Sequence, residues 1–332
     1  MVEANCAKIQ IRRRELLVTA LAGALFPLAA TRQSMPAPLT PEETKRKLEE
    51  YQAKAAEARA KALAAFPFER IEVPGEIALT KWEELKAAGR GFPVIVGSDD
   101  ALATLADPFS DHWPNKRSVV DILRDAERLQ HPADLFALRV QERAKAAEFL
   151  KQHLEKQPNA PLPKMSEIDA QGRRRELTPE EARAAILQDL DRMPPTGDWP
   201  TEVAPAPGLS VVFDFKTRGP LQKAYIVLIP TDDWTTVPAH LHWGGWNACP
   251  SPEYHVAALR SWRDRYGVEL VGLNNDTVNL TAARAPQART EAMELAREQY
   301  AYCNDIVDQG VQTMSALAAT LTISPWWYFW WD

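Results

Sequence analysis

The chain has 332 residues, of which 45% are hydrophobic and 25% charged, and its formal net charge is -6. This composition is typical of a globular protein with one or two domains. An acidic chain lacks the clustered Lys and Arg residues that nucleic-acid binding requires. Three Cys residues are too few for a disulfide scaffold.

The first thirty residues have the features of an export signal. Three arginines at positions 12–14 precede an apolar run, residues 16–30, that is too short to cross a bilayer about 30 Å thick. The segment Arg13-Arg14-Glu15-Leu16-Leu17 resembles the twin-arginine motif. We therefore expect residues 1–30 to be a signal peptide and the protein to be periplasmic or secreted, with no stable membrane anchor after cleavage. The alternative is an uncleaved apolar helix that serves as an anchor.

Residues 31–66 are predicted to be a linker followed by a charged helix. Thr40-Pro41-Glu42-Glu43 is a capping box with proline in the first turn, so the helix is expected from residue 41 to about residue 65. Apolar residues at helical spacing share one side of it: Leu48, Tyr51, Ala55, Ala58 and Ala62. Because this apolar face is thin, we expect the helix either to dock on another surface or to remain solvated.

Residues 67–193 are predicted to form a mostly helical region with one strand, at residues 92–96. Helices are expected at about 99–106, 116–129 and 133–156. A second capping box, Thr178-Pro179-Glu180-Glu181, begins another helix that ends near Met193. The proline-rich segment from Pro194 to Pro207 then marks the predicted domain boundary.

Residues 194–332 are predicted to form a tryptophan-rich α+β domain, because nine of the eleven Trp residues lie here. Strands are expected at 209–213, 224–229, 268–273 and 277–282, and helices at 252–266, from 286 to about 303, and at 309–321. The cluster Asn274-Asn275-Asp276 is typical of a hairpin turn with positive φ. The aromatic tail, 325–332, is apolar on both faces, which predicts a central strand covered on both sides. This order indicates one mixed or antiparallel sheet covered by helices.

Four segments of this domain resemble the hallmarks of a known family. They are Trp243-Gly244-Gly245-Trp246-Asn247-Ala248-Cys249-Pro250, Glu298-Gln299-Tyr300-Ala301-Tyr302-Cys303, Asp305-Ile306-Val307-Asp308-Gln309-Gly310 and Phe329-Trp330-Trp331-Asp332. Together and in this order they resemble the bacterial domain-of-unknown-function family 4253, over about residues 194–332. The resemblance implies a small α+β domain at the C-terminus of a bacterial protein, and it implies no activity.

Cys249 and Cys303 form the first candidate site. After export they would meet an oxidising compartment, where a disulfide between them would stabilise the fold by about 4 kcal/mol. One alternative is a pair of separate buried thiols that fill space in the core.

The other alternative is a hydrolase or transferase with Cys249 as its nucleophile. Cys249 precedes a predicted helix N-terminus, which lowers a thiol pKa. A histidine would be the base and a carboxylate would orient it. The candidates for these two roles are His240, His242 or His255, and Asp305 or Asp308.

A metal site is a further hypothesis. His240, His242, Cys249 and His255 lie close together in the sequence, and zinc accepts imidazole and thiolate ligands. Their spacing matches no common zinc module, so histidines on a surface or a helix face are the favoured interpretation. No cofactor is favoured.

The favoured function is that of a binding or interaction domain. Flat aromatic rings together with amide and carboxylate groups suit a sugar, a peptide or a partner protein. The predicted binding residues are Trp243, Trp246, Asn247, Tyr302, Asp305 and Gln309. The alternative is that the tryptophans belong to the core and that Asn247 and Asp305 cap helices. The expected partner is thus a protein, a peptide or a small polar ligand.

Overall fold

The computed structural model describes residues 40–110, 113, 117–156, 162, 165–168, 174–189 and 193–332. The expected signal peptide lies outside the described residues. The chain divides into two compact units, one made of residues 37–136 and 194–332, the other containing residues 137–193. No helix in the described part of the chain has the length and apolar character needed to cross a membrane.

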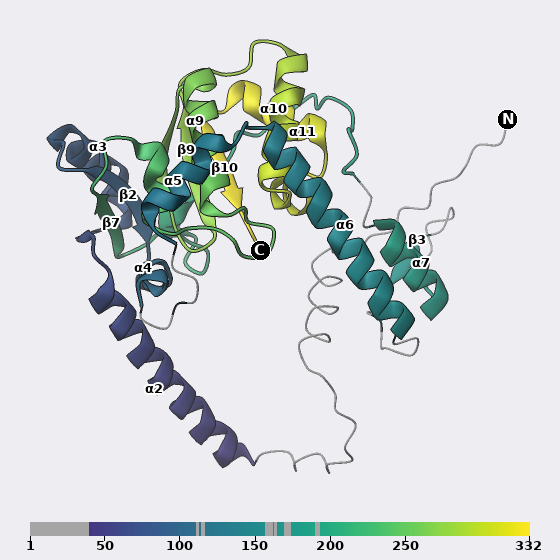
Figure 1. The fold of residues 1–332 in the computed structure, drawn as a ribbon, viewed down its shortest axis with the longest axis horizontal. Coiled ribbons are helices and arrows are strands. Elements are labelled where there is room, and N and C mark those ends of the chain that lie inside the picture. Colours follow the sequence, from purple (N-terminus) through teal and green to yellow (C-terminus); the bar gives the residue numbers. More distant parts are fainter. Residues whose placement is uncertain are drawn as a thin grey trace. The chain divides into compact units, whose positions relative to one another are not determined.

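A six-stranded sheet is the framework of the larger unit (Figure 1). Neighbouring strands are antiparallel, except β2 and β8, which are parallel. The prediction of an α+β fold with a mixed sheet is therefore confirmed. In spatial order the strands are β1 (Glu69–Val73), β7 (Ala224–Ile229), β2 (Phe92–Gly97), β8 (Val268–Leu273), β9 (Thr277–Ala282) and β10 (Trp326–Trp330).

The N-terminal half of the chain supplies two strands of this sheet. β2 is the strand predicted at residues 92–96, whereas β1 has a weak sequence signal because charged residues surround Ile71. β1 lies at an edge of the sheet, where charged side chains can reach water. Both strands pair with β7, so the larger unit extends across the proline-rich boundary that composition suggested.

Two long helices cover one face of the sheet. They are α9 (Pro252–Tyr266) and α10 (Arg289–Tyr302), and α11 (Met314–Ile323) packs on α10. Trp262 of α9 stacks on Phe329 of β10, with ring centroids 5.6 Å apart. Both side chains are fully buried, so this aromatic layer is the centre of the core.

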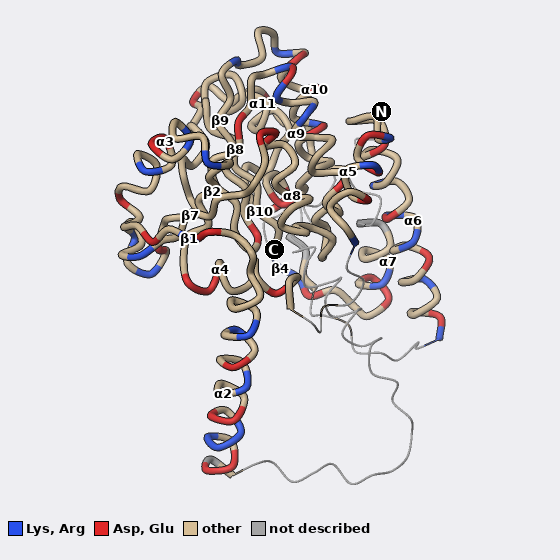
Figure 2. Tube along the Cα trace, turned by 60° about the vertical axis from the view of Figure 1, so that its left-hand side comes forward, with Lys and Arg blue, Asp and Glu red and all other residues tan. Residues whose placement is uncertain are grey.

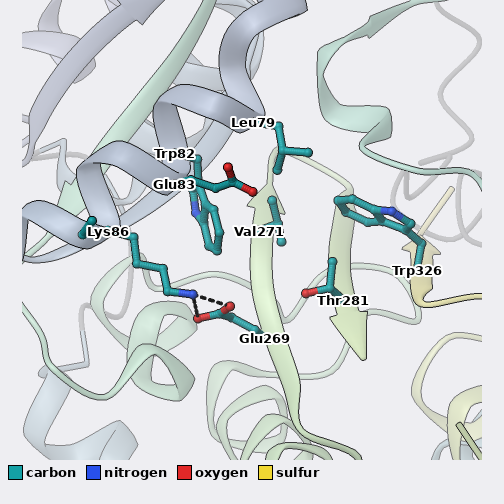
Figure 3. Close-up of a pocket in the computed structure, with 9 residues that line it drawn as sticks. Leu79, Trp82, Glu83, Lys86, Glu269, Val271, Thr281 and Trp326 are labelled. Carbon is teal, nitrogen blue, oxygen red and sulfur yellow. Dashed lines mark hydrogen bonds and ion pairs between the residues drawn. The ribbon is translucent and has the colours of Figure 1, made fainter. Parts of the chain in front are cut away.

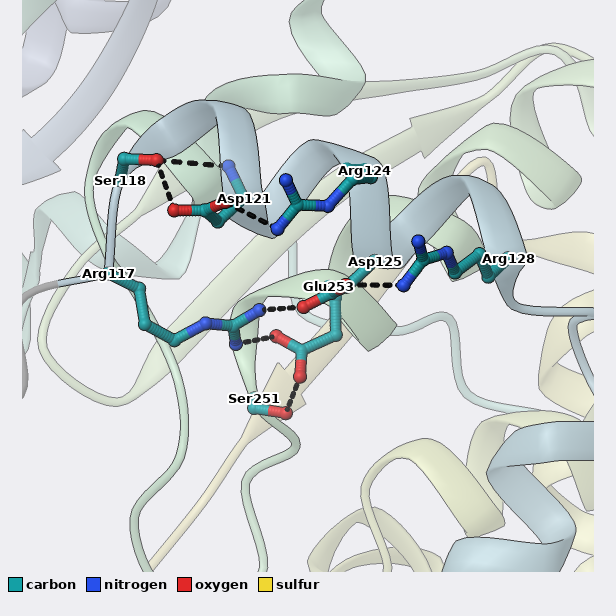
Figure 4. A network of polar contacts seen from close by, with 8 residues as sticks. All are labelled: Arg117, Ser118, Asp121, Arg124, Asp125, Arg128, Ser251 and Glu253. Atoms are coloured by element: carbon teal, nitrogen blue, oxygen red, sulfur yellow. Dashed lines mark hydrogen bonds and ion pairs between the residues drawn. The ribbon is translucent and has the colours of Figure 1, made fainter.

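A polar clamp fixes the beginning of α9 to α5 (Val119–Arg128) (Figure 4). The Arg117 guanidinium donates to Glu253 at 2.8 Å and to Asp125 at 2.5 Å. The Ser251 hydroxyl also donates to Glu253, at 2.8 Å. The clamp holds the first turn of α9, next to the hallmark segment that ends at Pro250.

The opposite face of the sheet is covered by α3 (Ala78–Ala88) and a short 3-10 helix, Ser210–Val212. Asn279 in β9 is fully buried, and its Oδ1 accepts hydrogen bonds from the backbone N–H groups of Ser210 and Val211, at 3.0 and 3.1 Å. Because these N–H groups bond to a side chain and not to a neighbouring strand, the strand predicted at 209–213 is wrong. A two-residue strand, β5 (Phe213–Asp214), follows and pairs with β6 (Gly219–Pro220).

The aromatic tail forms an edge strand, so the prediction of a central strand is wrong. Among the strands that the structure describes, β10 pairs only with β9. Trp327 and Phe329 are buried on the helix-covered face, whereas Trp326, Tyr328 and Trp330 are half-buried on the other face. One set of aromatic residues therefore lies in the core, and the other is partly exposed to solvent.

Two local predictions in this region are also wrong. The turn between β8 and β9 has no residue with positive φ. Asn274 Oδ1 instead accepts from the N–H groups of Asp276 and Thr277, at 3.1 and 2.8 Å, and so closes the turn with a side chain. The helix predicted at 309–321 is divided: a short π-helix, Ile306–Val311, ends at Gln312 with a left-handed φ of 69°, and α11 begins at Met314 after the extended cap residue Thr313.

The helix α2 (Pro41–Ala65) has its predicted capping box: Thr40 Oγ1 accepts from the Glu43 N–H, and Glu43 accepts from the Thr40 N–H. Its last turns pack on α4 (Asp99–Ala106). The rest of α2 extends away from the sheet (Figure 2).

The smaller unit is built from most of α6 (Ala133–Lys156), from α7 (Pro179–Asp189) and from a two-stranded sheet, β3 (Ser166–Ile168) and β4 (Arg174–Glu176). Leu150, Leu154, Met165, Ala182, Ala185 and Ile186 form its core.

Candidate functional site

The hallmark segments meet in a buried chain of three polar side chains. Cys249 Sγ lies 3.4 Å from His255 Nε2, and His255 Nδ1 lies 2.6 Å from the Tyr302 hydroxyl. The three residues are 4%, 0% and 1% exposed. Cys249 precedes α9, His255 is in its first turns and Tyr302 ends α10. Packing of the two helices therefore brings together the thiol and one of the histidines that the sequence predicted.

Aromatic rings and backbone enclose this chain. The ring centroids of Trp243 and Trp331 lie 4.6 and 5.7 Å from that of His255. Gly244 has φ of 115°, and a Cβ there would lie 2.7 Å from His255 Nε2 and 2.2 Å from the carbonyl oxygen of Pro250. A catalytic thiol must reach its substrate, whereas these groups are desolvated and bonded to one another. The arrangement is that of a structural hydrogen-bond chain in the core.

A hydroxyl group bonds to His255 at the position that the catalytic hypothesis assigned to a carboxylate. The ring nitrogen that would receive such a carboxylate, Nδ1, faces Tyr302. Asp305 instead accepts from Gln309 Nε2 at 3.1 Å, and Asp308 accepts from the Tyr300 hydroxyl at 3.3 Å. Burial raises the pKa of Asp305, although hydrogen bonds to its carboxylate oppose the effect. The structure thus joins the predicted thiol and imidazole to a phenol, and it bonds Asp305 and Asp308 to other side chains.

The predicted disulfide between Cys249 and Cys303 is absent from the structure. Both residues are buried, and the Cys303 thiol donates to the carbonyl oxygen of Trp330 at 2.9 Å. Burial raises the pKa of Cys303 well above its ordinary value. The geometry matches the interpretation of two separate thiols that fill the core.

The surface end of the hallmark region is a small polar cluster. Asn247 Nδ2 donates to the Asp332 carbonyl oxygen at 2.9 Å, and the Asp332 N–H donates to Asp305 Oδ2 at 3.0 Å. These bonds fasten the residues after β10 to the loop before α9. Three of the six predicted binding residues, Asn247, Asp305 and Gln309, thus hold this end of the fold. Trp243 and Tyr302 belong to the core, and Trp246 packs edge to face on Trp243 with centroids 5.0 Å apart.

The four predicted metal ligands do not converge. His240 ends α8 (Val237–His240), and burial lowers its pKa. His242 packs edge to face on Phe109, with ring centroids 5.4 Å apart. Cys249 and His255 belong to the buried chain. Within the described residues, no three or more His, Cys, Asp and Glu side chains are grouped so as to hold a metal ion.

A depression of about 490 Å³ lies on the other face of the sheet, between α3 and strands β8 to β10 (Figure 3). Lys86 Nζ lies 2.6 Å from the Glu269 carboxylate and 4.7 Å from the centroid of the Trp82 ring. The Trp326 ring stands on the side opposite α3. Apolar and hydroxyl groups lie between them. The lining residues are Leu79, Trp82, Glu83, Lys86, Ala87, Glu269, Val271, Thr281 and Trp326.

A second depression, of about 320 Å³, lies where β2 and β8 end. Ser98 and Asn274, the residues that follow these parallel strands, both line it. Ligands commonly bind beyond the carboxyl ends of strands in open sheets. Tyr328 lines the same depression, as do Phe213 and Phe215, which are 40% and 76% exposed.

Alternate residues of β10 connect the two depressions, because side chains two apart in a strand share a face. Trp326 lines the first depression and Tyr328 the second, and Trp330 stacks on Tyr328 with centroids 5.3 Å apart. We call Trp326, Tyr328 and Trp330 the aromatic row. The row and both depressions combine flat apolar surface with carboxylate, amide and hydroxyl groups.

The prediction from sequence missed the aromatic row, because every residue at 326–331 is aromatic and alternation cannot separate the two faces. The sequence of β9, the strand that pairs with β10, distinguishes the two faces. β9 reads Thr-Val-Asn-Leu-Thr-Ala, with polar residues at alternate positions. In the register of the sheet, Trp326, Tyr328 and Trp330 lie opposite the polar residues Thr281, Asn279 and Thr277.

Comparison with known families confirms the resemblance. Residues 225–332 match the model of a domain of unknown function, DUF4253. The match begins with β7, later than the expected start near residue 194. It includes the buried chain and the aromatic row, whereas α3, one wall of the first depression, precedes it. Comparisons with curated proteins and with solved structures gave no match.

Proposed function

We propose that this protein is an exported binding protein whose aromatic row and two flanking depressions bind a neutral oligosaccharide. The observation that carries the proposal is the placement of Trp326 and Tyr328. These two side chains lie on one face of one strand, and each lines a separate depression. A ligand with repeated units can therefore contact both depressions at once.

The chemistry of the face suits sugar rings. A pyranose has apolar C–H faces and a rim of hydroxyl groups, so it needs flat apolar surface beside hydrogen-bonding groups. Trp and Tyr supply such surface at a small cost in conformational entropy. Thr281 in the first depression and Asn274 in the second supply donors and acceptors at its margin. Two residues along a strand advance about 6.6 Å, on the scale of one sugar ring.

The charges of the face favour a neutral ligand. Lys86 and Glu269 are paired in the first depression, so neither presents an isolated charge. Asp214 and Asp276 line the second depression together with Lys216. A face with more carboxylates than amines repels polyanions, which excludes nucleic acid and disfavours acidic polysaccharides.

The binding prediction is tested by Trp326→Ala. We expect this variant to bind oligosaccharides at least about tenfold more weakly, because loss of one stacked ring costs about 1.4 kcal/mol or more. Isothermal titration with gluco-, chito- and xylo-oligosaccharides measures the effect, and thermal unfolding checks the fold. Tyr328→Ala is expected to act in the same direction.

Val120→Ala is the matched control, because Val120 is 71% exposed on α5, on the helix-covered side of the sheet. It should bind as the unaltered protein does. A Trp326→Ala variant that keeps full affinity, or an unaltered protein that binds none of these sugars, would contradict the proposal.

The export component rests on the sequence of residues 1–30. The basic segment, the short apolar run and the twin-arginine-like Arg13-Arg14 pair support it. We expect Arg13→Lys/Arg14→Lys to retain the protein in the cytoplasm, and fractionation with N-terminal sequencing to find the unaltered protein outside it, without Met1. Recovery of the unaltered protein from the cytoplasm with Met1 attached would show that the segment does not direct export.

A further inference from the structure

The exposed part of α2 carries an apolar stripe with the spacing of a coiled coil. Leu48, Tyr51, Ala55, Ala58 and Ala62 follow one another at intervals of three and four residues, as positions a and d of a heptad do. Ala62 is fully buried where α2 packs on α4, whereas Leu48 and Tyr51 are 54% and 72% exposed. The stripe that docks α2 on α4 therefore continues beyond this contact as an open surface.

Basic residues flank this stripe on both sides. Lys47, Lys54 and Lys61 recur every seven residues along one flank, and Lys45 and Arg59 lie on the other. The acidic residues Glu49, Glu50 and Glu57 fall on the back of the helix. Figure 2 shows these charges along the projecting helix.

The ion pairs that α2 forms within the protein are too weak to keep its basic side chains from a partner protein. Lys45 and Lys61 pair with glutamates one turn away, and Arg59 pairs with Asp100, but each of these side chains is at least half exposed. Lys47 and Lys54 form no ion pair with any residue that the structure describes.

We propose that α2 docks an amphipathic helix of another protein whose stripe is flanked by acidic residues. Alanines at positions 55 and 58 let a second helix approach closely, and Leu48 and Tyr51 supply the larger contacts. Glutamates beside the partner's stripe would face the lysine flank, and such complementary flanks set the choice of partner in coiled coils.

The same charges disfavour two other occupants. In an antiparallel pair with a second copy, Lys54 would face Lys54 and Lys47 would face Lys61, so like charges would oppose association. A bilayer surface would gain little, because most of the stripe is alanine and insertion depends on buried apolar area.

The test uses the full chain and two fluorescent synthetic helices. Both probes have Leu and Ala at positions a and d; one has Glu and the other Lys at e and g. We expect the Glu probe to bind at least about tenfold more tightly in anisotropy titrations, with a preference that weakens as salt rises. In Lys47→Glu/Lys54→Glu/Lys61→Glu the preference should reverse. Ala55→Glu should abolish binding, and Glu50→Gln, on the back of the helix, should leave it unchanged.

Equal binding of the two probes, binding that survives Ala55→Glu, or failure of both probes to bind would overturn the proposal. So would sedimentation as a dimer that Ala55→Glu dissociates, or tighter binding to phosphatidylglycerol vesicles than to the Glu probe. Circular dichroism of each variant confirms that α2 is still folded.

Discussion

Replacing Gly244 with Ala should destabilise the protein by about 3 kcal/mol or more. The φ of 115° at Gly244 is strained for a residue with a side chain, which costs about 1–3 kcal/mol. The added Cβ would also lie 2.2 Å from the carbonyl oxygen of Pro250 and 2.7 Å from His255 Nε2. Neither group can move freely, since one is backbone and the other is fully buried, so overpacking adds about 1–3 kcal/mol.

A substitution at the neighbouring glycine, Gly245, separates the cost of backbone strain from the cost of the steric clash. Gly245 also has positive φ, 87°, but the nearest atom to a Cβ there is Ser251 Cα at 4.0 Å. Gly245→Ala should therefore cost only about 1 kcal/mol. Guanidinium unfolding followed by tryptophan fluorescence measures both variants. Equal losses in the two variants would mean that a Cβ at position 244 does not clash with His255 or Pro250.

This result would assign a structural role to the hallmark segments. The chain Cys249–His255–Tyr302 lies between α9 and α10, and the bonds among Asn247, Asp332 and Asp305 fasten the end of β10 to the same region. These segments hold β10 at the edge of the sheet, and the aromatic row depends on that placement. Residues of the core therefore position the face that bears the aromatic row without forming it.

The elements with strong local signals could be predicted from the sequence. The helix α9 begins at Pro252 and stops at Gly267, whose left-handed φ of 61° only glycine adopts readily. The strands β7, β8 and β9 are rich in β-branched and apolar residues, and each has the predicted bounds. In these segments local propensity and tertiary packing favour the same structure.

Other features depend on contacts between distant segments. No local pattern pairs β1 with β7, and residues 209–213 lose their strand only because Asn279, far along the chain, takes their N–H groups. The sequence placed Cys249 near a histidine, but the burial of both follows from how α9 and α10 pack on β10. Of the six predicted binding residues, Trp243 and Tyr302 therefore lie in the core, whereas the aromatic row lies on the other face of the sheet.

Glu298 is the buried carboxylate between α9 and α10, and Glu298→Gln should cost about 2–3 kcal/mol at pH 7. Its carboxylate accepts from Arg265 at 2.7 Å and from Trp262 Nε1 at 3.2 Å. Burial alone would raise the pKa of Glu298, but the His131 ring at 3.7 Å, hydrogen bonds from Arg265 and Trp262 and the charge of Arg265 lower it below its ordinary value. The Arg265 side chain is 37% exposed, so water screens part of the attraction and we expect a loss below that of a fully buried pair.

The pH dependence shows whether the charge of Glu298 is the cause. The folded-state pKa is lower than the unfolded value of about 4.3, so the stabilisation is fully present above that pH and is lost as pH falls through the folded pKa. The gap between the unaltered protein and Glu298→Gln should thus be largest near neutral pH and shrink below about pH 4. Glu294→Gln, an exposed site on the same helix, should change stability by less than about 0.5 kcal/mol. A gap that stayed constant on acidification would mean that shape and hydrogen-bond geometry, not charge, join the two helices here.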